Sequence, residues 1–459
     1  MSTNEDVLRS FYRARRRGEL GTAAALLAAD VEWSGPARDG RRNTVRGREA
    51  VLAELRAERG ELVAEPHAQL PSGPRVVVLG EYRCDGGAVD GMVPFTHIWD
   101  FRDGVVVRFE DVHDPAGIRR VRCGDAAELD EIIVLGLGFW RSAVLLAAVR
   151  LGVFTALAGC ELGAVELAAR TGVHERGAQD FFDCLVALGL LRRRNGRYRN
   201  APHAAAHLDG HDPARYVGGL LEEAGSQWFR SWALLPEALA QGAPQWTVPA
   251  DDVHPYGRIY AEPERVWRFR SAMAGGAMMA KLALPRRLRW SRYRTVADIG
   301  CCGGELLAHL LDHHPHLRAT GFDLPAVADA FETTAARRPA GSMRFVAGNF
   351  FTDPLPEADV LVFGHVLHNW GLEEKKLLLR KAYQALPDHG EVVIYEVLVD
   401  DDRLRHVEGL LMSLHMLVMS PRGFGYTGTE CRSWLAEAGF RSSKVERLAG
   451  DEFMVIGTK

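Results

Sequence analysis

Several features that would assign this chain to a particular compartment or partner are absent. Cysteine is sparse, and its seven residues are scattered without a CxxC pair, which favours a reduced compartment over a disulfide-stabilised fold. The formal net charge of −4 gives no reason to expect nucleic acid or an anionic membrane as a partner. No apolar run approaches the length of about 20 residues that spans a bilayer, and residues 1–6 carry no signal-peptide pattern. We therefore expect a cytoplasmic protein.

The remaining composition is that of an ordinary globular protein with several domains. The chain has 459 residues, of which 47% are hydrophobic and 25% are charged. Changes of pattern along the chain predict three regions. These are an α+β unit over residues 1–122, a mostly helical region over residues 126–292, and an α/β domain over residues 293–459.

The sequence pattern of the first region predicts helices followed by a β-meander. Helical patterns cover residues 4–17, 20–28 and 47–57, and strand patterns cover residues 75–82, 93–102 and 105–112. Asp103-Gly104 is a strong two-residue hairpin signal between the last two strands. The segments at residues 30–33 and 95–104 resemble SnoaL-like proteins of the NTF2-like superfamily. That resemblance implies a cone with one pocket, which some members use for isomerisation or polyketide cyclisation.

One face of the predicted hairpin gathers aromatic and ionisable residues. With a two-residue turn, this face consists of Phe95, His97, Trp99, Phe101, Arg108 and Glu110. His97 and Glu110 in an apolar cone could form an acid/base pair. The alternative is a satisfied polar pair in a domain kept for assembly. The residues assigned to the pocket are Tyr12, Trp33, Trp99 and Phe101.

The second region has the pattern of a winged helix. A helix near residues 165–173 is followed by a second over 177–191 and by a hairpin at Asn195-Gly196. The second helix is mostly apolar, with one basic candidate near its start at Arg176, so it lacks the positive surface of a DNA-reading helix. A transcriptional regulator is kept only as the non-enzyme alternative, because winged helices also occur in such proteins. Residues 139–149 are apolar nearly all round, which predicts burial in a core or a subunit interface.

The third region alternates strands and helices, which predicts a doubly wound parallel sheet. Residues 296–305 (VADIGCCGGE) read as a buried strand, a glycine-rich turn and the start of a helix. A second short strand then ends at Asp323. A glycine turn lets the backbone approach a ligand closely, and an acid after the next strand can hold ribose hydroxyls. The predicted strands lie near residues 295–299, 319–323, 343–347, 358–363, 390–396, 441–447 and 452–457.

The turn does not fit the GxGxxG pattern of an NAD-binding domain. Together with the segments at residues 344–351 and 358–370, it makes residues 126–459 resemble the small-molecule O-methyltransferases that use S-adenosylmethionine. The resemblance implies a winged-helix dimerisation region, a homodimer, and a Rossmann-like methyltransferase domain. It assigns cofactor binding to Asp298, Gly300, Gly304, Asp323, Leu324, Asn349, Phe350 and His365.

The resemblance also implies a general base at His368, the His of the family's HDW motif. Removing the proton of an acceptor hydroxyl suits an imidazole whose pKa is near neutrality. The chain departs from the family at four points: Cys302 within the glycine turn, Asn349, Asn369 and His415. Asn369 and His415 join His368 as catalytic candidates. Because Asn369 replaces an aspartate, and no acid appears near residues 422–427, His368 is expected to lack a supporting carboxylate.

Methionine and aromatic residues are expected on the substrate side, because methionine can line pockets for flat ligands although it is more often core. These residues are Met273, Trp370, Met412, Met416 and Met419. A further hypothesis groups His365, His368 and His415 as three imidazole ligands of a metal, in a metal-assisted C-methyltransferase. The alternative is that His365 packs under the sheet and His415 contacts the substrate.

The sequence thus predicts a dimeric enzyme of secondary metabolism. It would transfer a methyl group from S-adenosylmethionine to a hydroxyl of a small aromatic or polyketide-type metabolite. A descendant that binds the cofactor without methylating, and assists hydroxylation or cyclisation, is the other enzyme alternative.

Overall fold

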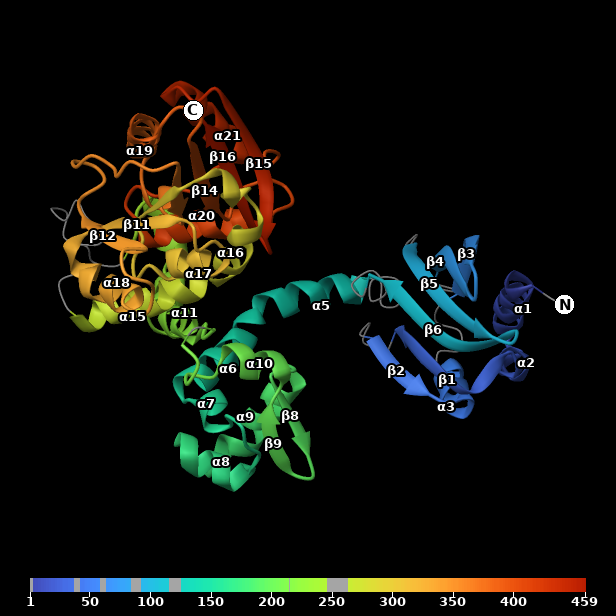
Figure 1. Cartoon of the computed structure of the whole chain (residues 1–459). Coiled ribbons are helices and arrows are strands. Elements are labelled where there is room, and N and C mark those ends of the chain that lie inside the picture. The colour runs from blue at the N-terminus through green and yellow to red at the C-terminus, as the bar shows by residue number, and fades with distance from the viewer. Residues whose placement is uncertain are drawn as a thin grey trace. The chain divides into compact units, whose positions relative to one another are not determined.

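The computed structural model describes residues 3–36, 42–57, 63–83, 92–114, 125–213, 215–245 and 263–459. Its contacts divide the chain into two compact units, Met1–Phe139 and Trp140–Lys459, and each is described by itself (Figure 1). The predicted boundary at residue 122 lies outside the described residues. The three predicted domain boundaries stay predictions.

The first unit packs three helices on a six-stranded sheet of order β2-β1-β6-β5-β4-β3 (Figure 1). Thr3 and Asp6 form a capping box that starts the first helix. The predicted helix over residues 20–28 ends at Ala25, and three strands were not predicted. The elements are α1 (Asn4–Arg16), α2 (Leu20–Ala25), β1 (Leu27–Pro36), β2 (Arg42–Arg46), α3 (Arg48–Ala57), β3 (Val63–Ser72), β4 (Arg75–Arg83), β5 (Val93–Arg102) and β6 (Val105–His113).

A β-bulge in the β5–β6 hairpin overturns the predicted pairing of His97 with Glu110. The turn has two residues as predicted, but the register shifts between Phe101 and Asp100, so His97 lies opposite Asp111. A shift of one residue moves side chains to the other face of a sheet. Glu110 instead accepts a hydrogen bond from Arg108 at an exposed position.

His97 belongs to a continuous chain of buried hydrogen bonds. The Trp99 indole donates to the Tyr12 hydroxyl (3.2 Å), which in turn lies 2.6 Å from His97 Nδ1. On the other side of the ring, His97 Nε2 lies 2.8 Å from the Tyr82 hydroxyl, which donates to Asp111 (2.6 Å). Burial lowers the pKa of His97, so the ring is neutral and each of its nitrogens has a partner.

This network is sealed inside the aromatic core. His97 has no exposed surface, and Asp111 is 3% exposed. The four residues assigned to a pocket are likewise buried core residues; they are Tyr12, Trp33, Trp99 and Phe101. The geometry therefore favours the satisfied polar network over an acid/base pair that a substrate could reach.

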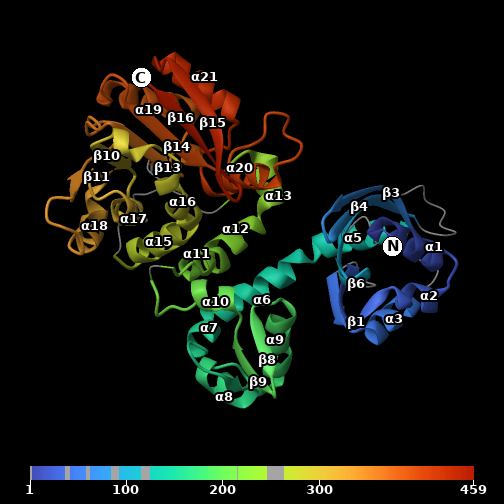
Figure 2. The ribbon, with the colours of Figure 1, turned by 45° about the vertical axis from the view of Figure 1, so that its right-hand side comes forward.

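The second unit begins with a winged-helix arrangement, as predicted (Figure 2). Asn195 and Gly196 both have positive φ, which is the hairpin conformation that Asn-Gly favours. The elements are α6 (Gly138–Arg150), which crosses the boundary between the units, α7 (Val153–Ala156), β7 (Leu162–Gly163), α8 (Ala164–Thr171), α9 (Glu175–Ala187), β8 (Leu191–Arg194), β9 (Arg197–Asn200) and α10 (Pro202–His207).

Further helices lead to the C-terminal sheet. They are α11 (Gly218–Glu223), α12 (Phe229–Trp232), α13 (Leu235–Gln241), α15 (Pro263–Gly276) and α16 (Met278–Ala283), with one π-helical turn over Ala224–Trp228.

Helix α5 (Asp125–Gly136) and helix α6 correct the expectation of no long apolar run. They contain Leu129–Arg150, which is long and apolar enough to cross a membrane by length and composition alone. Much of this surface is exposed in the single chain, including Leu135 and Trp140. An exposed apolar surface of this size marks an interaction surface rather than a core.

The C-terminal sheet has seven strands in the order β12-β11-β10-β13-β14-β16-β15. The first five strands are parallel, and β16 and β15 complete the sheet in antiparallel fashion. All predicted strands are present. They are β10 (Thr295–Ile299), β11 (Arg318–Asp323), β12 (Met343–Ala347), β13 (Val360–Gly364), β14 (Glu391–Glu396), β15 (Ser442–Ala449) and β16 (Glu452–Thr458).

Helices cover both faces of this sheet, because its strands are apolar on both sides. One face packs against α16, α17 (Glu305–His313) and α18 (Ala328–Ala335). The other packs against α19 (Leu372–Ala385) and α21 (Gly428–Ala438). Helix α20 (Val407–Met419) contacts the turn after β13. Ligands of such sheets bind at the carboxyl ends of the parallel strands.

The buried network of the first unit predicts a stability effect of Tyr82→Phe. Loss of the hydroxyl leaves His97 and Asp111 each without one buried partner, which should cost about 1–3 kcal/mol. Calorimetric unfolding of the full chain should show one transition shifted to lower temperature. Tyr216→Phe, which removes a hydroxyl bonded to Glu222 at an exposed position, should change stability by less than about 0.5 kcal/mol. Equal effects would contradict the network's role.

Candidate active site

The glycine-rich turn after β10 adopts a backbone that requires glycine at two points. Gly300 and Gly304 have φ values of +81° and +74°. A side chain at Gly304 would also come within 2.6 Å of the Phe331 ring. Cys302 sits between them at a φ of +48°, a conformation that costs a non-glycine residue some strain. The turn therefore forms despite the departure at Cys302.

Asp323 fastens this turn to the end of β11. Its carboxylate accepts hydrogen bonds from the backbone N–H of Cys302 (2.9 Å) and of Leu324 (2.7 Å). Burial nevertheless raises the pKa of Asp323 to about 6. The predicted residues Asp323, Leu324 and Gly300 are thus brought together at one edge of the sheet.

Acidic groups cluster beneath the same turn. Burial raises the pKa of Asp298 to about 8, and the charges of Asp323 and Glu305 add to the effect. Arg270, on α15, donates to the Glu305 carboxylate at 3.3 Å. An acidic cluster of this kind favours a ligand that carries positive charge.

The loop after β12 is tied to the end of β11, because Gly348 N–H donates to the Asp323 carbonyl (2.9 Å). The Asn349 side-chain oxygen accepts from Phe351 N–H at 2.9 Å, so this amide also shapes its own loop. Phe350 packs edge-on against Phe351 and Trp370. Trp370 is only 3% exposed within the core, which argues against its predicted contact with substrate.

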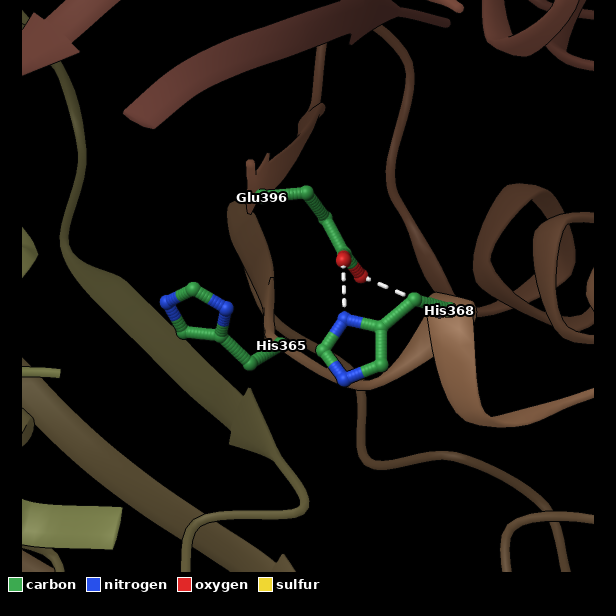
Figure 3. A group of neighbouring side chains, drawn as sticks. All are labelled: His365, His368 and Glu396. Carbon is green, nitrogen blue, oxygen red and sulfur yellow. Dashed lines mark hydrogen bonds and ion pairs between the residues drawn. The ribbon is translucent and has the colours of Figure 1, made fainter. Parts of the chain in front are cut away.

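His368 is supported by a buried carboxylate that the sequence analysis missed. Glu396, the last residue of β14, bonds to His368 Nδ1, and its other oxygen accepts from the His368 backbone N–H at 3.3 Å (Figure 3). His368 is 7% exposed and Glu396 is 2% exposed. Burial alone would raise the pKa of Glu396, but the charge and hydrogen bonds of His368 hold it below its usual range. The expectation of an unsupported His368 was wrong.

This arrangement fixes the tautomer of His368. An ionised carboxylate only accepts hydrogen bonds, so His368 Nδ1 carries the proton and Nε2 carries the lone pair. Figure 3 shows Nε2 pointing away from Glu396. A ring held in this way can accept a proton from a ligand at Nε2, and the Glu396 carboxylate then stabilises the imidazolium without itself taking the proton.

The turn that carries His368 is held by its neighbours. The Asn369 amide donates to the carbonyls of His365 (2.9 Å) and Val366 (3.3 Å), so its side chain holds the turn, and its catalytic role stays a prediction. An aspartate could not donate these bonds. Lys375 is fully buried and donates to the carbonyls of Trp370 (2.6 Å) and Phe424 (3.2 Å). Phe424 N–H in turn donates to the His368 carbonyl at 2.9 Å.

His365 has a carboxylate partner of its own. Its Nε2 lies 3.0 Å from Glu452, and its φ of +52° turns the ring beside His368. Within the described residues, the groups with ligand atoms near enough for a metal are His365–His368–Glu396 and His406–Glu408–Asp451. His415 belongs to neither, so the three-imidazole set is not assembled. In the first group, both histidines already have carboxylate partners.

Helix α20 carries four of the predicted residues at helical spacing, which places them along one side of the helix. They are Met412, His415, Met416 and Met419. Met416 is buried in protein, whereas the other three are half-buried. His415 Nδ1 receives a hydrogen bond from the Trp232 indole at 3.0 Å. Met273 lies three residues from Arg270 on α15, which is the spacing of neighbours on one helix face.

Sequence reasoning missed Glu396, Arg270 and Trp232. Glu396 ends a strand that reads as plain core, but its charge in that apolar run was a signal. Arg270 and Trp232 lie in helices that are distant in sequence from the site, and no local pattern marks them.

Comparison with known proteins agrees with this geometry. Family models match residues 8–109 as a SnoaL-like domain, residues 134–210 as an O-methyltransferase dimerisation domain, and residues 232–441 as an O-methyltransferase domain. The tetracenomycin polyketide synthesis 8-O-methyl transferase TcmO of Streptomyces glaucescens is 43% identical over 72% of this chain and 96% of its own. The 3-hydroxy-5-methyl-1-naphthoate 3-O-methyltransferase of Streptomyces sahachiroi is 35% identical over 71% of this chain and 94% of its own.

Solved structures lead to the same family. Human N-acetylserotonin methyltransferase in complex with S-adenosylmethionine superposes with a TM-score of 0.66 and 28% identity, over 73% of this chain and 98% of its own. The winged-helix region is therefore a dimerisation domain rather than a sign of a regulator. The chain belongs to the family of S-adenosylmethionine-dependent small-molecule O-methyltransferases, and it methylates a hydroxyl group in secondary metabolism.

Proposed function

We propose that the acceptor is a phenolic hydroxyl of an aromatic polyketide-type metabolite, and that His368 is the general base. The observation that carries the proposal is the buried His368–Glu396 pair, whose free Nε2 is aimed away from the carboxylate. The relatives named for tetracenomycin and naphthoate methylation support the acceptor class. The half-buried methionines of α20 suit a flat ligand.

The chain's own part in the reaction concerns the proton. When bound, S-adenosylmethionine would supply an electrophilic methyl group to the acceptor oxygen, and its sulfur would keep the electron pair of the bond to that methyl. His368 Nε2 takes the hydroxyl proton, and Glu396 stabilises the imidazolium that results. The turn held by Asn369 and Lys375 keeps the ring in place, which serves orientation.

The residues around the glycine turn fit this cofactor. Asp323 would accept from ribose hydroxyls, and the positive φ values of Gly300 and Gly304 shape the turn that would hold the methionyl part. The acidic cluster suits the sulfonium and amino charges, while Arg270 supplies a positive group at Gly303 for the carboxylate. Phe350 is proposed for the adenine, at the place where the family has its Asp-Phe pair. His365 is proposed to flank the cofactor site through its contact with His368.

We further propose a cytoplasmic homodimer in which the exposed apolar surface of α5 and α6 forms part of the subunit interface. The match to the dimerisation domain, which includes most of this surface, supports that assignment. A protein interface accounts for its exposure in the single chain without a membrane. The sealed network around His97 supports an assembly role for the SnoaL-like domain.

Replacing Glu396 by glutamine should separate catalysis from cofactor binding. A neutral amide cannot stabilise the His368 imidazolium. Its N–H can also donate to Nδ1, which favours the Nε2–H tautomer that cannot accept a proton at Nε2. The value of kcat should therefore fall roughly 100-fold or more. The Kd for S-adenosylmethionine, measured by calorimetric titration, should stay within about threefold. Glu452→Gln makes the same chemical change beside His365 and should lower kcat far less. Equal losses in the two variants would contradict the assignment of the base.

Cofactor binding should weaken in acid through Asp323. Ionised Asp323 accepts the ribose hydroxyls, and its pKa of about 6 means that it becomes protonated as the pH falls below that value. The Kd for S-adenosylhomocysteine should therefore rise about tenfold for each pH unit below 6. Asp323→Asn should bind weakly at neutral pH and lose this dependence. A flat profile in the unaltered protein would contradict the role of Asp323.

A further inference from the structure

His415 is held by a tryptophan from a helix that is distant in sequence. Trp232, at the end of α12, directs its indole N–H to His415 Nδ1 at 3.0 Å. Trp228 packs edge-on against the same imidazole, with ring centroids 4.7 Å apart. An indole N–H can only donate a hydrogen bond. His415 Nδ1 therefore carries the lone pair.

The proton of this ring must then sit on Nε2. Burial lowers the pKa of His415 to about 4, and the charge of His368 contributes to the shift. The imidazole is thus neutral near pH 7, and a neutral imidazole has a single N–H. With Nδ1 accepting from Trp232, His415 presents Nε2–H as a hydrogen-bond donor.

His368 presents the opposite polarity. Its Nδ1–H faces Glu396, so its Nε2 is a proton acceptor. Helix α20, which carries His415, packs on the turn that carries His368. The two imidazoles therefore lie on elements that contact each other, as one ligand that meets both would require. One ring takes a proton and the other offers one.

We propose that His415 donates a hydrogen bond to a second oxygen of the acceptor, a carbonyl ortho or peri to the hydroxyl that is methylated. The acceptor class is then a hydroxy-aryl ketone or a hydroxyquinone. This inference rests on the proposed function of His368 as the base. It assigns to His415 a role in specificity in place of proton removal or metal binding.

A hydrogen-bond donor at His415 would help an acceptor of this kind to react. A hydroxyl beside a carbonyl keeps its proton in an internal hydrogen bond, which withholds that proton from a base. A donor bound to the carbonyl substitutes for this bond and frees the hydroxyl for His368. After the proton passes to His368 Nε2, two electron-rich oxygens face each other, and His415 Nε2–H reduces their repulsion.

An acceptor that lacks the carbonyl would leave the His415 donor without a partner. A site built around a polar contact discriminates strongly against a ligand that cannot make it. The expected discrimination by His415 is on the order of 10- to 100-fold in kcat/KM.

A matched pair of acceptors tests the inference: 1-hydroxyanthraquinone, with its hydroxyl peri to a carbonyl, and 1-hydroxyanthracene, without the carbonyl. The two differ in acidity, so the test is the change in their kcat/KM ratio between the unaltered enzyme and His415→Ala. The substitution should lower kcat/KM for the anthraquinone on the order of 10- to 100-fold more than for the anthracenol. His415→Asn, which keeps an N–H donor, should recover part of the difference.

The outcomes separate the two proposals. Equal losses on both acceptors in His415→Ala, or no loss on either, would overturn the role of His415 and leave His368 as the base. Turnover of neither acceptor by the unaltered enzyme, with S-adenosylmethionine bound, would contradict the proposed acceptor class together with this inference.

The tautomer can be measured without turnover. In full-length protein labelled with 15N-histidine, the His415 signal, assigned by its loss in His415→Asn, should show the Nε2–H tautomer at pH 7. It should not titrate above about pH 5. Trp232→Phe keeps an aromatic ring and removes the donor, so both tautomers should then appear. An Nδ1–H tautomer in the unaltered protein would overturn the inference.

Discussion

The contact between the His368 ring and the Glu396 carboxylate is the interaction on which the rest of the site depends. A carboxylate that is 2% exposed is costly unless it is paired, and His368 supplies both a ring and a backbone donor. The pair in turn fixes the tautomer that leaves His368 Nε2 as a hydrogen-bond acceptor. The neighbouring contacts of Asn369, Lys375 and Phe424 all act on the turn that holds this histidine.

Electrostatics divides the carboxyl edge of the sheet into two parts. At the glycine turn, burial raises the pKa of Asp298 to about 8, and the nearby charges of Asp323 and Glu305 add to that shift. That part suits a cationic cofactor. Beside it, His368 and His415 are rings of opposite hydrogen-bonding polarity, held by Glu396 and by Trp232. This part suits a neutral acceptor that must lose one proton.

Most of the fold could be predicted from local patterns. Buried strands, glycine turns and Asn-Gly or Asp-Gly hairpins each have a signal that lies within a few consecutive residues. The C-terminal strands and the Asp323 contact to the turn follow from such patterns. Contacts between residues far apart in the sequence could not be predicted from such patterns. Glu396 lies 28 residues beyond His368 on a neighbouring strand, and Trp232 lies 183 residues before His415. The bulge that pairs His97 with Asp111 adds one residue that no turn signal reveals.

A crystal structure with S-adenosylhomocysteine and a bound aromatic acceptor tests the central claim most directly. The account predicts the reacting hydroxyl within about 3 Å of His368 Nε2, with the Glu396 contact retained. The same oxygen should point at the cofactor's sulfur, in line for transfer. An acceptor whose hydroxyl lies away from His368, against another base or open water, would contradict the account.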